Sequence, residues 1–162
     1  WDPQAVQRAM VWLSGSIYNS TWDKIRTLAT WLTIGMAGSA LIAREMDLLI
    51  LGDETARARG QRVELIRAVM FVLCAVLSGA AVAAAGLVAF VGLIAPHIAR
   101  SLVGHSHGLM LPVTALSGGL LVVGADLAAR TLFTPAPLPV GLMTAILGAP
   151  FFAYLMWRKR NV

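Results

Sequence analysis

The sequence predicts an all-α membrane protein that crosses the bilayer several times, and three observations support this fold class. Of the 162 residues, 58% are hydrophobic and only 13% are charged, against roughly 45–50% and roughly 25% in an ordinary soluble domain. The mean hydropathy is +0.75, and the charges lie in clusters separated by long uncharged intervals. A core of this size could not bury so much apolar surface, so a soluble monomer is excluded.

Four uncharged intervals contain the expected membrane helices. The first is 27–43 and the third is 109–125, each about long enough for one crossing. The last runs from 131 to 157, but three prolines near its start disfavour a helix there. Its membrane helix is therefore expected from about Val140 to Trp157.

The second interval, 68–99, is too long for one crossing, because a straight helix would measure about 48 Å against a hydrocarbon core of ~30 Å. Lys and Arg concentrate on the cytoplasmic side of membrane proteins. Two crossings of this interval place most basic residues on one side, whereas one crossing divides them almost evenly. We therefore expect a break near Gly79–Gly86, with a helix over 62–83 and a short one over 86–100. The total is about five transmembrane helices, one of them short.

The charge pattern also explains the net charge of +5 without a nucleic-acid partner, since the excess lies in loops next to membrane segments. The loop 44–67 and the C-terminus fall on the basic, cytoplasmic side. Short helices at membrane depth persist where protein or a water-filled cavity surrounds them, as in transporters.

The loop 44–67 carries acidic and basic residues in balance. Asp53 is placed to cap a helix that ends at Arg59, with Gly60 as its left-handed terminator. Leucines and an isoleucine precede this short helix. Balanced charge beside an apolar patch favours a protein partner over anionic lipid, although a plain solvated loop remains an alternative.

Residues that carry catalysis or bind metals are few. Neither lysine closes a glycine-rich phosphate loop, so the chain has no motif for ATP hydrolysis and we expect no enzymatic activity and no cofactor. His105 and His107 form a weak metal site without a nearby carboxylate, so no metal is expected. His97, next to Pro96 at the expected end of the short helix, is read as a packing residue. The single Cys74 excludes an intramolecular disulfide.

Two further features lie in the last third of the chain. Asp126 and Arg130 are spaced i,i+4 near the outer end of their helix, which favours a local ion pair. Gly148 and Pro150 are expected to interrupt or kink the last helix.

The chain also resembles a known family. Residues 52–60 contain the pattern Glu-x-Ala-x-x-x-Gly, and two more specific stretches follow, GLVAFVGLIAPHIARSLVG at 86–104 and LLVVGADLAARTLFTPAPLPVGLMTAILGAPFFAYL at 120–155. They resemble the permeases of the iron-siderophore, haem and vitamin B12 ATP-binding-cassette (ABC) importers, the FecCD-type or BtuC-like family. The resemblance covers essentially the whole chain, with WLSGS at 12–16 similar to a periplasmic stretch. Members of the family are considerably longer.

The resemblance implies a domain organisation and a function. The chain would be the C-terminal half of a permease, with residues 1–26 periplasmic and residues 27–162 forming the transmembrane domain in a bacterial inner membrane. It would import a ferric siderophore, or haem or vitamin B12, as a homodimer with ABC ATPase subunits and a periplasmic substrate-binding protein. A non-transporting assembly or anchor subunit and a secondary transporter are the alternatives. A secondary transporter normally carries an ionisable group deep in a segment.

The resemblance also implies site residues. Arg130 would face the periplasm and dock the binding protein, with the local pair to Asp126 as the alternative role. The last helix and its outer approach would border the translocation path, near Pro139, Gly141, Gly148 and Pro150. The short cytoplasmic coupling helices of the loop 44–67 would contact the ATPase through Gly52, Asp53, Glu54, Ala56, Arg57 and Gly60.

Overall fold

The computed structural model describes residues 15, 20–133 and 138–160, and every regular element among them is an α-helix, which confirms the predicted fold class. Of the predicted periplasmic segment 1–26, the structure describes Gly15 and residues 20–26, and residues 22–26 already belong to the first described helix. The rest of WLSGS, Pro135 and Pro137 lie outside the described residues. The elements are α2 (Trp22–Leu41), α3 (Ala43–Ile50), α4 (Asp53–Ala58), α5 (Val63–Ala85), α6 (Val91–Val103), α7 (His107–Leu132) and α8 (Val140–Arg160).

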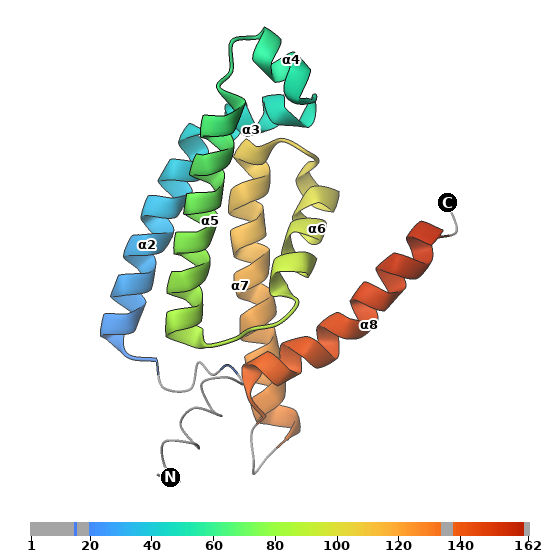
Figure 1. The fold of residues 1–162 in the computed structure, drawn as a ribbon. Coiled ribbons are helices and arrows are strands. Elements are labelled where there is room, and N and C mark those ends of the chain that lie inside the picture. Colours follow the sequence, from blue (N-terminus) through green and yellow to red (C-terminus); the bar gives the residue numbers. More distant parts are fainter. Residues whose placement is uncertain (1–14, 16–19, 134–137, 161–162) are drawn as a thin grey trace, which may run out of the picture.

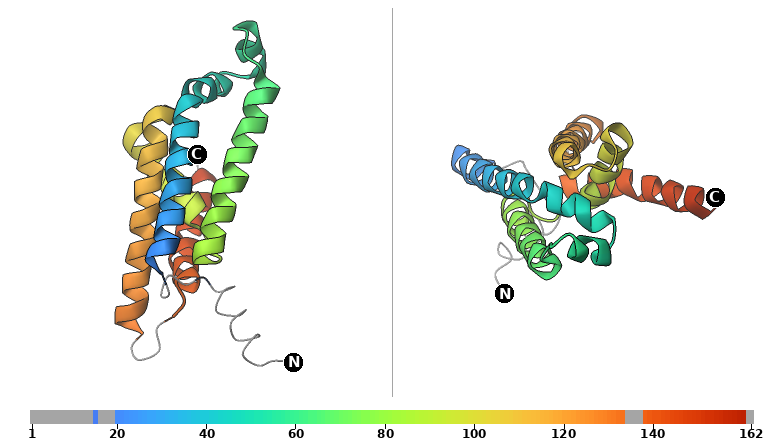
Figure 2. Two further views of the ribbon diagram at one scale, coloured as in Figure 1. Left: turned by 90° about the vertical axis from the view of Figure 1, so that its left-hand side faces the viewer. Right: turned by 90° about the horizontal axis from the view of Figure 1, so that it is seen from above.

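The helices alternate in direction, as Figure 1 shows. Helix α2 leads to α3 and α4 at one end of the bundle, which we call the α4 end; α5 runs back from it, α6 returns, α7 runs back and α8 returns. The loop 44–67, the turn between α6 and α7 and the last turn of α8 therefore point the same way. This is the arrangement that two crossings of the interval 68–99 require. Helix α8 leans away from the other helices, so its last turns lie apart from them (Figure 2).

Two of the described helices, α5 and α7, are each long and apolar enough to cross a membrane. Helices α2 and α3 together form a third candidate span, bent by 54° where they meet. Helix α6 and the stretch Val140–Tyr154 of α8 are apolar but shorter. Five crossings therefore stay a prediction, which the alternating directions favour.

The break between α5 and α6 lies later than the sequence predicted. Helix α5 continues through Gly79 to Ala85, since alanine is the strongest helix former, and the break occupies residues 86–90. Gly86 has φ 73° and Phe90 has φ 64°, a left-handed conformation that interrupts a right-handed helix. The expected boundaries, 62–83 and 86–100, were thus wrong by a few residues.

Helix α6 was predicted to end at Pro96 and His97. Instead it contains both residues and continues to Val103. The terminator is Gly104, which has φ 79° and donates its backbone N–H to the carbonyl of Arg100. A left-handed glycine is a common helix end.

Small residues bring the helices close together, although not all where the sequence placed them. On α2, a side chain at Gly35 would overlap Leu77 of α5, and one at Gly38 would lie 3.2 Å from Leu73. At Gly79, within the predicted small-residue stretch, an added Cβ would meet nothing within 4 Å. The close packing of α2 on α5 therefore depends on glycines of α2.

Helices α7 and α8 share a small buried cluster of Ala125, Ala129 and Met143. Helix α8 continues from Val140 to Arg160 as one helix that contains Pro150, so it is not interrupted at Gly148 and Pro150. A kink at this point stays a prediction. Many large apolar side chains of α5 and α7 are exposed instead of buried. This exposure fits surfaces that contact lipid or further helices.

Candidate functional site

Two glycines bound the short helix α4. Gly52 has φ 101° and precedes the helix, and Gly60 has φ 82° and follows it, which confirms the left-handed terminator. The predicted cap is wrong: Asp53 is the first residue of the helix and makes no side-chain capping hydrogen bond. Both of its carboxylate oxygens instead accept from Arg67 Nη2 of α5, each at 2.8 Å. The carboxylate of Asp53 binds Arg67 of the next helix in place of a backbone N–H, because these hydrogen bonds join two full charges and are therefore stronger.

Three contacts fix α4 on its neighbours. The Asp53–Arg67 pair and a 3.0 Å pair between Arg57 and Glu64 join it to α5. Both pairs are largely exposed, so each stabilises the fold by only about 0.2–1 kcal/mol. Ala56 is completely buried. The charges of Asp53 and Arg57, expected at a partner interface, are therefore already engaged within the chain.

The α4 end retains other groups that a partner can contact. Glu54 and Arg59 are exposed, and neither has an ion-pair partner among residues 20–133 and 138–160. Ile50 and Leu51, immediately before the helix, are each 57% exposed. Exposed apolar side chains bordered by polar residues mark sites of protein interaction. We call Ile50, Leu51, Glu54 and Arg59 the α4 surface.

Helix α3 is tied to the start of α7 through Asp47, a contact that the sequence did not predict. Asp47 Oδ1 accepts from the backbone N–H of His107 at 2.8 Å and lies 2.6 Å from its ring Nδ1, and Ser106 Oγ donates to Oδ2 at 3.3 Å. The backbone hydrogen bond from His107, followed by its ring, lowers the pKa of Asp47. A carboxylate thus does lie beside His107, contrary to expectation. No group of three metal-ligating side chains exists among the described residues.

At the opposite end of α7, Arg130 Nε and Asp126 Oδ2 form the predicted i,i+4 pair at 2.8 Å. The arginine side chain is 44% exposed and the aspartate 18%. The pair orients the guanidinium while leaving part of it accessible.

The residues expected near a translocation path lie at the start and middle of α8. Pro139 is half-buried and accepts the first backbone hydrogen bonds of the helix. Gly141 is buried close to the backbone of Gly15, whereas Pro150 is exposed. Gly148 is buried directly against Phe90 of the α5–α6 break, so that a side chain there would overlap it.

His97 of α6 packs on α8, as the sequence predicted for a packing residue. Its ring meets that of Phe151 edge-on, with centroids 5.9 Å apart and planes at 73°. Helix α8 therefore contacts α6 through Phe151 and the α5–α6 break through Gly148.

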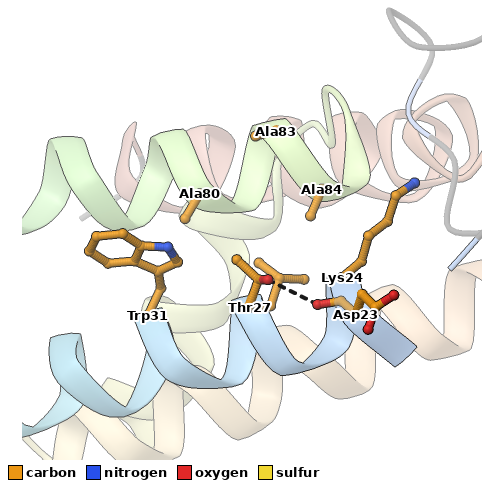
Figure 3. A pocket seen from close by; sticks show the side chains of 8 residues that line it. Asp23, Lys24, Thr27, Trp31, Ala80, Ala83 and Ala84 are labelled. Carbon is orange, nitrogen blue, oxygen red and sulfur yellow. Dashed lines mark hydrogen bonds between the residues drawn. The ribbon is translucent and has the colours of Figure 1, made fainter. Parts of the chain in front are cut away.

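A groove of about 330 Å³ separates α2 and α5 at the end opposite to α4. Figure 3 shows Trp31 and Thr27 of α2 facing Ala80 and Ala84 of α5, with Lys24 at its edge. Thr27 Oγ1 donates to the backbone carbonyl of Asp23 at 2.9 Å. The small alanine side chains leave this space open. Apart from the number of alanines, no feature of the sequence predicted this groove.

The fold and these contacts define a class: an all-α membrane protein whose spanning helices carry a small charged helical module at one end. The chain belongs to the FecCD transport family, whose family model matches residues 1–158. This confirms the resemblance found in the sequence.

Several named proteins are similar to the chain. It is 43% identical over 155 residues to YfhA of Bacillus subtilis (strain 168), named a probable siderophore transport system permease protein, covering 95% of this chain and 45% of YfhA. It is 40% identical over 158 residues to FecD of Escherichia coli (strain K12), an Fe(3+) dicitrate transport system permease protein, covering 98% and 50%. BtuC of Halobacterium salinarum, a cobalamin import system permease protein, is 41% identical over 157 residues, covering 97% and 42%.

A solved structure shares the fold. It is assigned to a metal-chelate type ABC transporter in an inward-facing conformation and matches with a TM-score of 0.87 and 31% identity, over 98% of this chain and 51% of that chain. The chain thus spans about half the length of the relatives that it matches.

Proposed function

We propose that the chain forms part of the permease subunit of an ABC importer in a bacterial inner membrane. The observation that carries this proposal is the α4 module: a short helix bounded by two left-handed glycines, fixed to α5 by two ion pairs, with the charges of Glu54 and Arg59 left exposed. A rigid rod of this kind can transmit the motion of a partner without unfolding. The relatives' names, all permease proteins of import or transport systems, support the same reading.

The partner at the α4 end would be an ABC ATPase, which hydrolyses ATP in place of this chain. The roles of the predicted coupling residues then divide. Glu54 contacts the ATPase, and Asp53 and Arg57 hold the helix in place. The other three shape the helix: Gly52 and Gly60 bound it, and Ala56 packs it against its neighbours.

The orientation follows from the same assignment. The loop 44–67 and the C-terminus would be cytoplasmic, and residues 1–26 periplasmic. Arg130, at the far end of α7, would dock a periplasmic binding protein, and the start of α8 would border the path. The permease would work as a homodimer. Its substrate would be a ferric siderophore, with haem or vitamin B12 as the alternatives, in line with the iron-transport names among its relatives.

The two alternatives fit less well. A non-transporting anchor has no need for a rigid, glycine-bounded helix at one end. A secondary transporter normally carries an ionisable group deep in the membrane, whereas Asp126, near the end of α7, is paired with Arg130.

The experiment that tests the proposal is co-purification of the permease with the ATPase encoded beside it, followed by measurement of ATP turnover with and without the binding protein. Glu54→Arg should abolish the complex, because it reverses an exposed charge at the interface. Asp23→Arg, the same charge change at the opposite end of the bundle, is the matched control and should leave the complex intact. An undiminished complex in Glu54→Arg would contradict the coupling role of α4.

A further inference from the structure

We propose that Asp47 is a positioning residue that links the α4 module mechanically to α7, so that its contact with His107 carries the signal between the ATPase end and the binding-protein end. This inference deepens the proposed function and rests on it. Its basis is geometric: one side chain of α3 bonds the N-terminus of a helix 60 residues later in the chain through three contacts.

The position of α3 is the first step. It lies directly before α4 in the chain, separated only by Leu51 and Gly52. Gln61, just after α4, donates its side-chain N–H to the backbone carbonyl of Glu45 at 2.8 Å. Both ends of α4 are therefore attached to α3, and a displacement of α4 moves α3 with it.

The second step is the strength of the attachment to α7. A carboxylate that accepts from a helix N-terminal N–H and from an adjacent imidazole makes charge-assisted hydrogen bonds, which are the strong kind, and the positive end of the helix dipole adds to them. The side chain of His107 is 19% exposed and that of Asp47 is 38% exposed. In the pairs that tie α4 to α5, both side chains are 40–76% exposed, so water competes less for the contact with His107.

The third step is that α7 reaches the other functional end as one helix. It runs unbroken from His107 to Leu132, and near its end Ala125 and Ala129 pack with Met143 of α8. The same end carries Arg130, proposed to meet the binding protein. A shift imposed at Asp47 therefore reaches both the docking residue and α8 without crossing a flexible loop.

The test uses the permease in complex with its ATPase and binding protein, reconstituted in nanodiscs. The measured quantity is the ratio of ATP turnover with the binding protein to turnover without it, at equal complex yield. Asp47→Ala should lower this ratio by roughly fivefold or more, the lower end of the usual range for coupling between sites. Asp47→Asn keeps an acceptor for the backbone N–H of His107 and should restore part of it.

A purely structural role gives a different result, since lower yield and lower turnover in both conditions leave the ratio unchanged. Ser101→Ala is the matched control, because among the described residues its hydroxyl donates to the carbonyl of Ile98 on the same helix. If Asp47→Ala gives no complex, His107→Ala decides, because it removes the ring contact and keeps the backbone hydrogen bond. The ratio in His107→Ala should then be lower than in the wild type.

The outcomes separate the two proposals. A wild-type complex that the binding protein does not stimulate would overturn the proposed function together with this inference. A stimulated wild type with an unchanged ratio in Asp47→Ala, or in His107→Ala where that variant decides, would overturn this inference alone.

Discussion

Gly148 of α8 lies against Phe90, and replacing it tests whether this contact positions α8. An added Cβ would overlap the Cβ and Cγ atoms of Phe90 and lie 3.1 Å from Cδ2. These atoms are next to the backbone, so a rotamer change cannot relieve the overlap. The α8 backbone or the residues 86–90 must move instead.

The expected magnitude follows from this overlap. Inserting a methyl group into a packed contact costs about 1–3 kcal/mol, and Gly148→Ala should fall in the upper half of that range because backbone must shift. Gly119→Ala on α7 is the matched control, since its Cβ would meet nothing within 4 Å. There the better helix propensity of alanine should stabilise the protein by about 0.5–1 kcal/mol.

The assay is thermal unfolding of the detergent-solubilised permease in a double-mutant cycle with Phe90→Gly, which removes the clashing ring and suits the positive φ. The cost of Gly148→Ala should largely disappear in the Phe90→Gly background. An equal cost in both backgrounds would refute the Phe90 contact as its cause. No cost in either would show that α8 is not held at this point.

Three further predictions concern the two ends of the molecule. Gly60→Ala forces a side chain into a left-handed conformation and should destabilise the α4 end by about 1–2 kcal/mol, measured by unfolding and ATPase binding. Gly60→Asn should cost less. Equal stability of the wild type and the two variants would contradict the strain. In titrations at low salt, Arg130→Ala should weaken the affinity of the permease for the binding protein by up to about fivefold, whereas Asp126→Asn should not. Unchanged affinity in Arg130→Ala would exclude a role of Arg130 in docking the binding protein. Because the folded-state pKa of Asp47 is lowered, its charge stabilises the fold above the ordinary carboxyl pKa and ceases to do so as pH falls through the folded value. The stability lost in Asp47→Asn should therefore persist from about pH 7 to about pH 5 and shrink only in stronger acid; a loss that already shrinks near neutral pH would contradict the ionised contact.

The sequence predicted the features that depend on local pattern. Uncharged intervals indicated the helices, the distribution of Lys and Arg indicated that α5 and α6 run in opposite directions, and the spacing of Asp126 and Arg130 indicated their pair. Each follows from neighbours in the chain or from the solvent on each side of a membrane.

Contacts between distant segments were the part that the sequence did not predict. Asp53 has the composition of a cap, but Arg67 arrives from another helix and takes its carboxylate. The sequence also gave no indication that Asp47 meets His107, since a helix-to-helix register cannot be deduced from one chain. The break at 86–90 was misplaced because the left-handed residue at its end is Phe90, which has no intrinsic preference for that conformation.

Import itself is the central claim, and transport by reconstituted proteoliposomes measures it most directly. The permease and ATPase are placed in vesicles with ATP available to the ATPase, and uptake of an iron-labelled siderophore is followed with the binding protein outside. The proposed function predicts accumulation that requires ATP, the ATPase and the binding protein together, and that is lost in Glu54→Arg. Accumulation driven by an ion gradient without the ATPase, or an assembled complex that moves none of the ferric siderophores, haem or vitamin B12, would contradict it.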